Sequence, residues 1–207
     1  MLSTQYRLRL ESICKCIANG EEVKLEDMIW AEKLRKANTT AREMLIIDNY
    51  FDDPSHIRDY AITNIKYNSP DEFQWWRGYR SEKLSIENTI ENEVITKIHS
   101  TLEKKVNRLI ENSDIYFHLS PEKIMVEEPD FHKTKWHTDP SDYAGVIYLT
   151  PNPPNNTGTC LDDHGCIENV YNRLLAYSSD TLHGPDHLFG DDICDVRMTI
   201  TFFVWFK

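Results

Sequence analysis

The feature that most constrains the fold is a change of hydrophobic period near Asp114. From there onward, apolar and polar residues alternate in short runs, separated by turn residues such as Pro153-Pro154 and Gly184-Pro185. Alternation with period two is typical of strands that bury one face. The predicted strands cover residues 115–120, 123–129, 143–150, 157–163, 172–179 and 196–206. Many short strands of this kind indicate a β-sandwich or a jelly roll.

The residues before Asp114 carry helical patterns instead. Apolar residues recur at helical spacing in 25–37 and again in 89–111, and Asp53 followed by Pro54 predicts the start of another helix. The apolar stripe of the 89–111 segment must cover something, and a sheet is the natural partner. We therefore expect an α+β fold, with a double-stranded β-helix (jelly roll) core and with N-terminal and central helices buttressing one sheet.

The length of the chain limits the number of domains. With 207 residues, it is long enough for one domain with a sizeable core and short for two. We expect a single domain over 1–207, in which residues 1–42 form a helical N-terminal extension and residues 114–207 form the jelly-roll core.

Charge and cysteine content narrow the class of protein. A formal net charge of −11 opposes binding to nucleic acid, whose affinity comes largely from phosphate neutralisation. The sequence contains no apolar stretch of membrane-spanning length and no secretory signal, so we expect a cytoplasmic protein without a membrane partner. The five cysteines are clustered in a way that suits free thiols in a reducing compartment. We therefore expect no structural disulfide.

A His-x-Asp pair stands just before one of the alternating runs. Because strand side chains alternate, His137 and Asp139 point the same way, as two neighbouring ligands of one metal ion would. A third ligand would come from a distant strand, and the downstream histidines are His164, His183 and His187. Two histidines and one carboxylate form the ligand set of non-haem iron sites. The spacing alone is a weak signal, because a surface histidine near an aspartate at a strand end gives the same pattern.

The C-terminal segment 196–206 has two distinct faces. Every second residue from Val196 to Phe206 is apolar, and the other face begins with Arg197, Thr199 and Thr201. The apolar face must be buried, so the opposite face is expected to point into the barrel. A guanidinium group placed there is costly without a charge to meet it, and it is well shaped to bind a carboxylate. The segment therefore indicates a pocket for a small anion such as a dicarboxylate.

Three motifs in order carry a family resemblance: "HTD" at 137–139, "NRLLAYSSDTLHG" at 172–184 and "RMT" at 197–199. Together they resemble the Fe(II)- and 2-oxoglutarate-dependent dioxygenases, in particular the prolyl-hydroxylase-like branch. The resemblance covers roughly residues 114–207. It implies that His137, Asp139 and His183 bind Fe(II), with O₂ as co-substrate.

The resemblance also implies a site for the second cofactor. Arg197 would pair with the distal carboxylate of 2-oxoglutarate, Thr199 would donate a hydroxyl to the same end, and Tyr148 would add its phenol. Many prolyl hydroxylases have Lys where this chain has Arg197. The implied activity is decarboxylation of 2-oxoglutarate to succinate, coupled to hydroxylation of a substrate. The substrate would be a small molecule or a peptide, for example a prolyl or other amino-acid side chain.

Alternatives stand beside this hypothesis. His187 is a rival to His183 as the third ligand, and Cys160, His164 and Cys166 could be imagined as a zinc site. The aromatic segment around Trp76 and Arg80 either forms a substrate lip or packs beside a glycine turn. The whole chain could instead be a non-catalytic jelly-roll module that binds a small acidic ligand or a protein partner. The sequence carries no signal for an oligomeric state.

Overall fold

The computed structural model describes residues 4–37, 44–71, 76–162 and 164–207. The chain divides into two compact units, Met1–Glu43 and Met44–Lys207, and each is described by itself. None of the helices in the described ranges combines the length and the apolar character that spanning a bilayer requires.

The first unit contains two helices, α1 (Thr4–Ala18) and α2 (Leu25–Ala37). The bounds of α2 match the helix predicted from the apolar spacing of this segment. Arg9 on α1 forms an ion pair of 2.7 Å with Asp27 on α2, and its guanidinium lies 4.3 Å from the centre of the Trp30 ring. These contacts join the two helices to each other.

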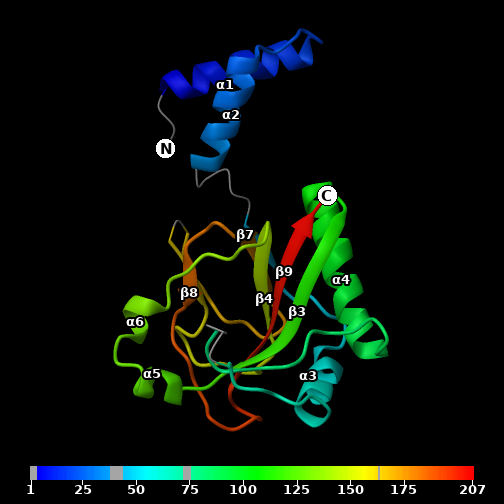
Figure 1. Ribbon diagram of the computed structural model, residues 1–207, viewed down its shortest axis with the longest axis vertical. Helices are drawn as coiled ribbons and strands as arrows, with labels where there is room; N and C mark the ends of the chain where they lie inside the picture. Colours follow the sequence, from blue (N-terminus) through cyan, green and yellow to red (C-terminus); the bar gives the residue numbers. More distant parts are fainter. Residues whose placement is uncertain (1–3, 38–43, 72–75, 163) are drawn as a thin grey trace. The chain divides into compact units, whose positions relative to one another are not determined.

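The second unit is built on two antiparallel sheets (Figure 1). The larger sheet has six strands, in the spatial order β1 (Leu45–Ile47), β7 (Leu174–Ser178), β4 (Tyr143–Tyr148), β9 (Arg197–Phe206), β3 (Ile110–Ser120) and β2 (Tyr79–Arg80). The smaller sheet has three, in the order β6 (Gly165–Ile167), β5 (Thr159–Leu161) and β8 (His183–Pro185). A mixed fold of helices with antiparallel sheets agrees with the α+β class expected from the sequence.

Two helices, α3 (Pro54–Thr63) and α4 (Thr89–Val106), cover one face of the larger sheet (Figure 1). The helix α3 starts as predicted, because the Asp53 carboxylate accepts the backbone N–H of His56 at 3.1 Å. The apolar side chains of β9 and of Val196 just before it share one core with both helices: Val196, Met198, Ile200, Phe202, Val204 and Phe206. One face of the long strand therefore packs in the hydrophobic core beneath the helices, and its polar face points to the opposite side of the sheet.

Two predictions of secondary structure were wrong. The helix expected over 89–111 ends at Val106, because Asn107 has a left-handed backbone (φ 56°) and begins the turn into β3. The strand expected over 123–129 is instead a short helix, α5 (Lys123–Glu127), followed by α6 (Phe131–Thr134). A strand would bury Ile124 and Val126 together, whereas Ile124 is buried and Val126 is 77% exposed. Short apolar runs do not distinguish a strand from a helix.

The expectation that no structural disulfide forms was also wrong. Cys160 on β5 and Cys166 on β6 are joined by a disulfide. The two residues are direct partners in the antiparallel register of this hairpin, which brings their side chains together on one face. Cys14, Cys16 and Cys194 are free thiols.

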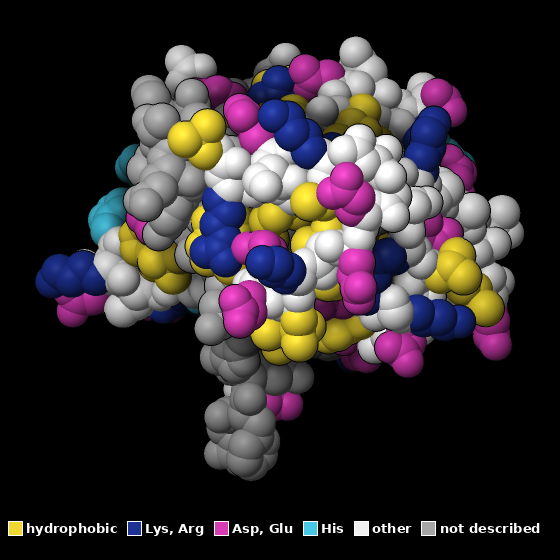
Figure 2. Space-filling model, turned by 90° about the horizontal axis from the view of Figure 1, so that it is seen from above, with side chains coloured by type: hydrophobic (Ala, Val, Ile, Leu, Met, Phe, Trp, Pro, Cys, Tyr) yellow, Lys and Arg dark blue, Asp and Glu magenta, His cyan; other side chains and the backbone are white. Residues whose placement is uncertain are grey.

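Charged side chains of both signs share the described surface that Figure 2 presents. Lys and Arg side chains lie among Asp and Glu side chains on that face, rather than in one continuous basic area. A basic patch is the usual electrostatic footprint of a nucleic-acid site. The face in Figure 2 therefore offers no such footprint among the described residues.

Asn172 ties the segment before α3 to the larger sheet. Its side chain accepts the backbone N–H of Phe51 at 2.8 Å and donates to the carbonyl of the same residue at 2.8 Å. Asn172 is buried and has a left-handed backbone with φ 63°. Asparagine tolerates this conformation better than most residues, and its amide satisfies two buried backbone groups at once.

We expect Asn172→Ala to lower the free energy of unfolding by about 2–4 kcal/mol, since it leaves two buried backbone groups unpaired and adds left-handed strain. Asn152→Ala is the matched control, because Asn152 is exposed and also has a positive φ of 49°. Strain alone should cost about 1 kcal/mol there. Urea unfolding of both variants measures the difference, and equal losses would contradict the role assigned to the amide.

Candidate metal centre

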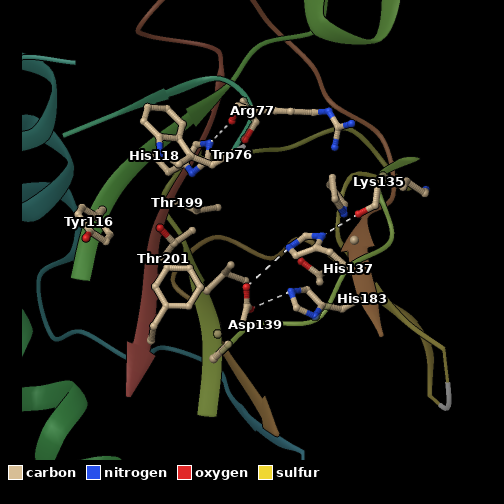
Figure 3. A pocket seen from close by; sticks show the side chains of 18 of the residues that line it. Trp76, Arg77, Tyr116, His118, Lys135, His137, Asp139, His183, Thr199 and Thr201 are labelled. Carbon is tan, nitrogen blue, oxygen red and sulfur yellow. Dashed lines mark hydrogen bonds and ion pairs between the residues drawn. The ribbon is translucent and has the colours of Figure 1, made fainter. Parts of the chain in front are cut away.

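Three side chains that lie far apart in the sequence meet in the second unit. His137, Asp139 and His183 each offer a ligand atom, and these atoms all lie within 4.8 Å of one another. The Asp139 carboxylate is 3.2 Å from Nε2 of His183 and 4.0 Å from Nε2 of His137 (Figure 3). The two imidazole rings have centroids 4.3 Å apart. The arrangement is the one that a single metal ion with three protein ligands requires.

Backbone hydrogen bonds bring these residues together. His137 and His183 exchange N–H···O=C bonds of 2.9 Å in both directions, which places them directly opposite each other in an antiparallel bridge. The N–H of Asp139 donates to the carbonyl of Ser179 at 2.9 Å, just after β7. Because side chains of residues two apart point the same way, Asp139 reaches the side of the chain that His137 faces.

Each histidine is oriented by a second hydrogen bond. Nδ1 of His137 lies 2.9 Å from the carbonyl oxygen of Lys135, and Nδ1 of His183 lies 2.9 Å from that of Thr181. A carbonyl only accepts, so Nδ1 carries the proton in both rings and Nε2 is left with its lone pair. A hydrogen bond of this kind fixes the ring for metal binding in metalloproteins generally.

The electrostatics also suit a cation. Burial, and next the neighbouring His183 ring, lower the pKa of His137 and favour its neutral form. The side chain of Asp139 is only 4% exposed, and no Lys or Arg nitrogen of the described residues lies within 4.0 Å of it. A buried carboxylate without a Lys or Arg partner lacks a full counter-charge. A divalent cation at this point would supply one, and two nitrogens with one oxygen fit a non-haem iron site.

The triad opens onto a cavity of about 520 Å³ that also contains the polar face of β9. Arg197 is 5% exposed and donates to the carbonyl oxygens of Thr157 and Gly158 at 3.0 and 3.3 Å. Within the described residues it has no carboxylate partner, and burial lowers its pKa. Among the described residues, the buried hydroxyl oxygens of Thr199 and Thr201 find no hydrogen-bond partner. A buried cation beside two unsatisfied hydroxyls is the environment that an anionic ligand would complete.

Tyr148 takes a different position from the other residues that the resemblance singled out. It is fully buried, and its phenol donates to Oγ1 of Thr159 at 2.8 Å. The guanidinium carbon of Arg197 lies 5.6 Å from the centre of the Tyr148 ring, so the ring packs near the guanidinium group. The described lining of the cavity includes Arg197, Thr199 and Thr159 but not Tyr148.

The rival ligands are placed elsewhere. His187 is half exposed, and its Nδ1 lies 3.1 Å from a carboxylate oxygen of Asp186. It does not belong to the His137, Asp139 and His183 group found in the described residues. His164 is exposed, and the disulfide between Cys160 and Cys166 removes the two thiolates that a zinc site would need.

The cavity also contains residues that the sequence singled out weakly or not at all. Trp76, Arg77 and Arg80 line it, and Trp75 lies outside the described residues. Tyr116 and His118 also line the cavity, on the opposite side from His137 and His183 in Figure 3. The alternation of β3 was the available signal, because it puts these two side chains on one face.

Comparisons with known proteins agree with the fold. A Pseudomonas putida prolyl-4-hydroxylase superposes with a TM-score of 0.53 at 12% identity, covering 81% of this chain and 95% of its own. AviO1 from Streptomyces viridochromogenes gives 0.48 at 11% identity, covering 88% and 95%. An oxidoreductase of the 2OG-Fe(II) oxygenase family from Burkholderia pseudomallei gives 0.47 at 13%, covering 89% and 92%.

The sequence comparisons are less informative. Residues 1–75 match a family described as Domain of unknown function (DUF8638). No curated protein was found to match the sequence. The comparison of structures therefore agrees with the resemblance at the level of the fold: this chain shares its fold with a prolyl-4-hydroxylase.

Proposed function

We propose that this protein is an Fe(II)- and 2-oxoglutarate-dependent oxygenase that hydroxylates a small-molecule or peptide substrate. The observation that carries the proposal is the convergence of His137, Asp139 and His183 at a cavity that Arg197 also lines, where this buried arginine has no carboxylate partner among the described residues. The two antiparallel sheets of the second unit support a double-stranded β-helix core around this cavity.

The contacts of these residues support a separate role for each in holding iron or 2-oxoglutarate. His137, Asp139 and His183 would hold the iron, with Nε2 of each ring available because Nδ1 donates to a backbone carbonyl. Arg197 would bind the distal carboxylate of 2-oxoglutarate, and the unpaired Thr199 hydroxyl would donate to the same end. When bound, iron and 2-oxoglutarate supply the oxidation, in which O₂ and 2-oxoglutarate yield succinate, CO₂ and a hydroxylated C–H bond.

The surroundings of the site support the same assignment. Thr157, Gly158 and Thr159 accept hydrogen bonds from Arg197 and fix the direction of its guanidinium. Fixed donors in a closed site need little rearrangement when the ligand binds. The Tyr177 ring packs against the His183 imidazole, with the two ring centroids 4.6 Å apart. The protein's contribution is therefore the placement of the ligands around the cavity.

The central test is anaerobic addition of Fe(II) and 2-oxoglutarate to the protein. We expect a weak visible charge-transfer band and, after admission of air, formation of succinate. Asp139→Ala should lose both signals, since it removes the anionic ligand. A wild-type protein that gives neither the band nor succinate would rule out the oxygenase. Retention of an acidic ligand without iron would favour a non-catalytic binding module.

The assignment of the third ligand is tested by two matched variants. His183→Ala should weaken Fe(II) binding by at least about a hundredfold, because it removes a ligand that is already oriented by Thr181. His187→Ala should leave Fe(II) binding within about threefold of wild type, since His187 contacts Asp186 instead. Isothermal titration with Fe(II) under argon measures both, and the reverse ranking would exclude His183.

The role of Arg197 is tested by a graded pair of variants. Arg197→Lys keeps a positive charge but loses the bidentate geometry, so we expect 2-oxoglutarate to bind about tenfold more weakly. Arg197→Gln removes the charge and should weaken binding by about a hundredfold or more. The intensity of the charge-transfer band against 2-oxoglutarate concentration gives both affinities. Unchanged affinity in Arg197→Gln would contradict the role, provided that thermal unfolding shows a folded variant.

A further inference from the structure

A second arginine faces the cavity and is not used by the proposed cofactors. Arg80, on the two-residue edge strand β2, lines the cavity on the side of β3. Its guanidinium carbon lies 4.8 Å from the ring centre of Trp76, 5.0 Å from that of Tyr116 and 5.8 Å from that of Phe203. Contacts of this kind hold a guanidinium in place while leaving its N–H groups available.

The charge of Arg80 is not neutralised by any described neighbour. No carboxylate oxygen of the described residues lies within 4.0 Å of its nitrogens, and its buried Nε has no hydrogen-bond partner. Burial lowers the pKa of Arg80 to about 10, and the group stays charged at neutral pH. Asp139 acts on it through space, but that carboxylate also faces both histidines and would be engaged by the metal.

One donor of Arg80 is already committed. Nε2 of His118 lies 2.5 Å from the carbonyl oxygen of Arg77, so it carries the proton and leaves Nδ1 as an acceptor. That Nδ1 lies 3.3 Å from Nη2 of Arg80. Burial, followed by the nearby Arg80, lowers the pKa of His118 to about 3 and keeps the ring neutral. His118 therefore acts as a positioning residue that aims the guanidinium.

The other charges on this side of the cavity have partners. Arg77 forms an ion pair of 2.6 Å with Glu128, and Asp114 forms one of 2.6 Å with Lys83. Of the two arginines that line the cavity near Trp76, Arg77 therefore has a carboxylate partner, and Arg80 has none among the described residues.

Arg80 and Arg197 are held by different contacts. Arg197 donates to the carbonyl oxygens of Thr157 and Gly158, whereas the Arg80 guanidinium lies near the Trp76, Tyr116 and Phe203 rings. In the register of the larger sheet, Arg80 is opposite His118, and His118 is opposite Thr199, two residues from Arg197 on β9. Because each guanidinium is fixed by its own contacts, an anion held by Arg197 leaves Arg80 for a second molecule.

We propose that Arg80 binds an oxyanion of the primary substrate, a small acid whose apolar or aromatic body packs against Trp76, Tyr116 and Phe203. The proposal rests on the proposed function and names the class of molecule that the same site would hydroxylate. A guanidinium group recognises carboxylate and phosphate by the same two-point geometry, so both are candidates for the oxyanion. The aromatic walls around it select against a fully hydrated, compact anion.

The experiment compares two aromatic acids with the neutral amide of one of them. Protein saturated with Zn(II), as a redox-inert metal, and with 2-oxoglutarate is titrated with phenylacetate, with phenylacetamide and with phenyl phosphate, and binding is followed by NMR. We expect at least one of the two anions to bind about ten- to a hundredfold more tightly than the neutral amide, since a charge-assisted pair is gained. Which anion binds better distinguishes a carboxylic acid from a phosphate ester. Equal binding of all three overturns the proposal.

Substitutions of single arginines test which of them causes the preference for the anion. Arg80→Gln should reduce the preference for the anion to less than about threefold, whereas Arg108→Gln, at an exposed arginine outside the cavity, should retain it. Loss of the preference in Arg197→Gln but not in Arg80→Gln would place the anion in the 2-oxoglutarate site and overturn the proposal. Loss of 2-oxoglutarate binding in a folded Arg80→Gln variant would overturn it too. If Arg80→Gln does not fold, the wild-type comparison of anion with amide still decides.

The outcome is separable from that of the proposed function. A wild-type protein that binds no 2-oxoglutarate in the presence of metal refutes the oxygenase itself. A protein that binds 2-oxoglutarate but shows no preference for the acid over the amide refutes only the assignment of Arg80.

Discussion

The pair of backbone hydrogen bonds between His137 and His183 is the constraint on which the site depends. These bonds, 2.9 Å in each direction, fix two residues 46 positions apart as direct cross-strand partners. Side chains of such partners stand on the same face, so both imidazoles point to one spot without further adjustment. Asp139 joins them because side chains two residues apart in an extended chain point the same way. A slip of one residue in this bridge would turn one imidazole away and separate the ligand set.

The strand β9 connects that site to the stability of the fold. One of its faces belongs to the core beneath α3 and α4, and the other carries Arg197, Thr199 and Thr201 into the cavity. Because the apolar face is packed along its whole length, the polar face has no freedom to rotate away. The core therefore holds Arg197 in a buried position that its own charge disfavours.

Part of this arrangement was predictable because it depends on local patterns. The two faces of β9, the helix over 25–37 and the Asp53 cap follow from periodicity and capping chemistry, and the structure agrees with each. The disulfide and the helical 123–127 segment were missed, because they depend on strand register and on which neighbour covers a short apolar run. The position of Arg80 depends likewise on the pairing of β2 with β3.

The unpaired polar groups of the cavity lower the stability of the folded protein, and packing in the core has to offset this loss. Arg197 and Arg80 are both buried or half-buried cations without a carboxylate partner among the described residues, and the buried hydroxyls of Thr199 and Thr201 have no hydrogen-bond partner there. Each such group destabilises the folded protein, and packing alone would favour apolar side chains of similar size. Under the proposed function, 2-oxoglutarate at Arg197 and an acidic substrate at Arg80 would supply the missing charges and hydrogen bonds.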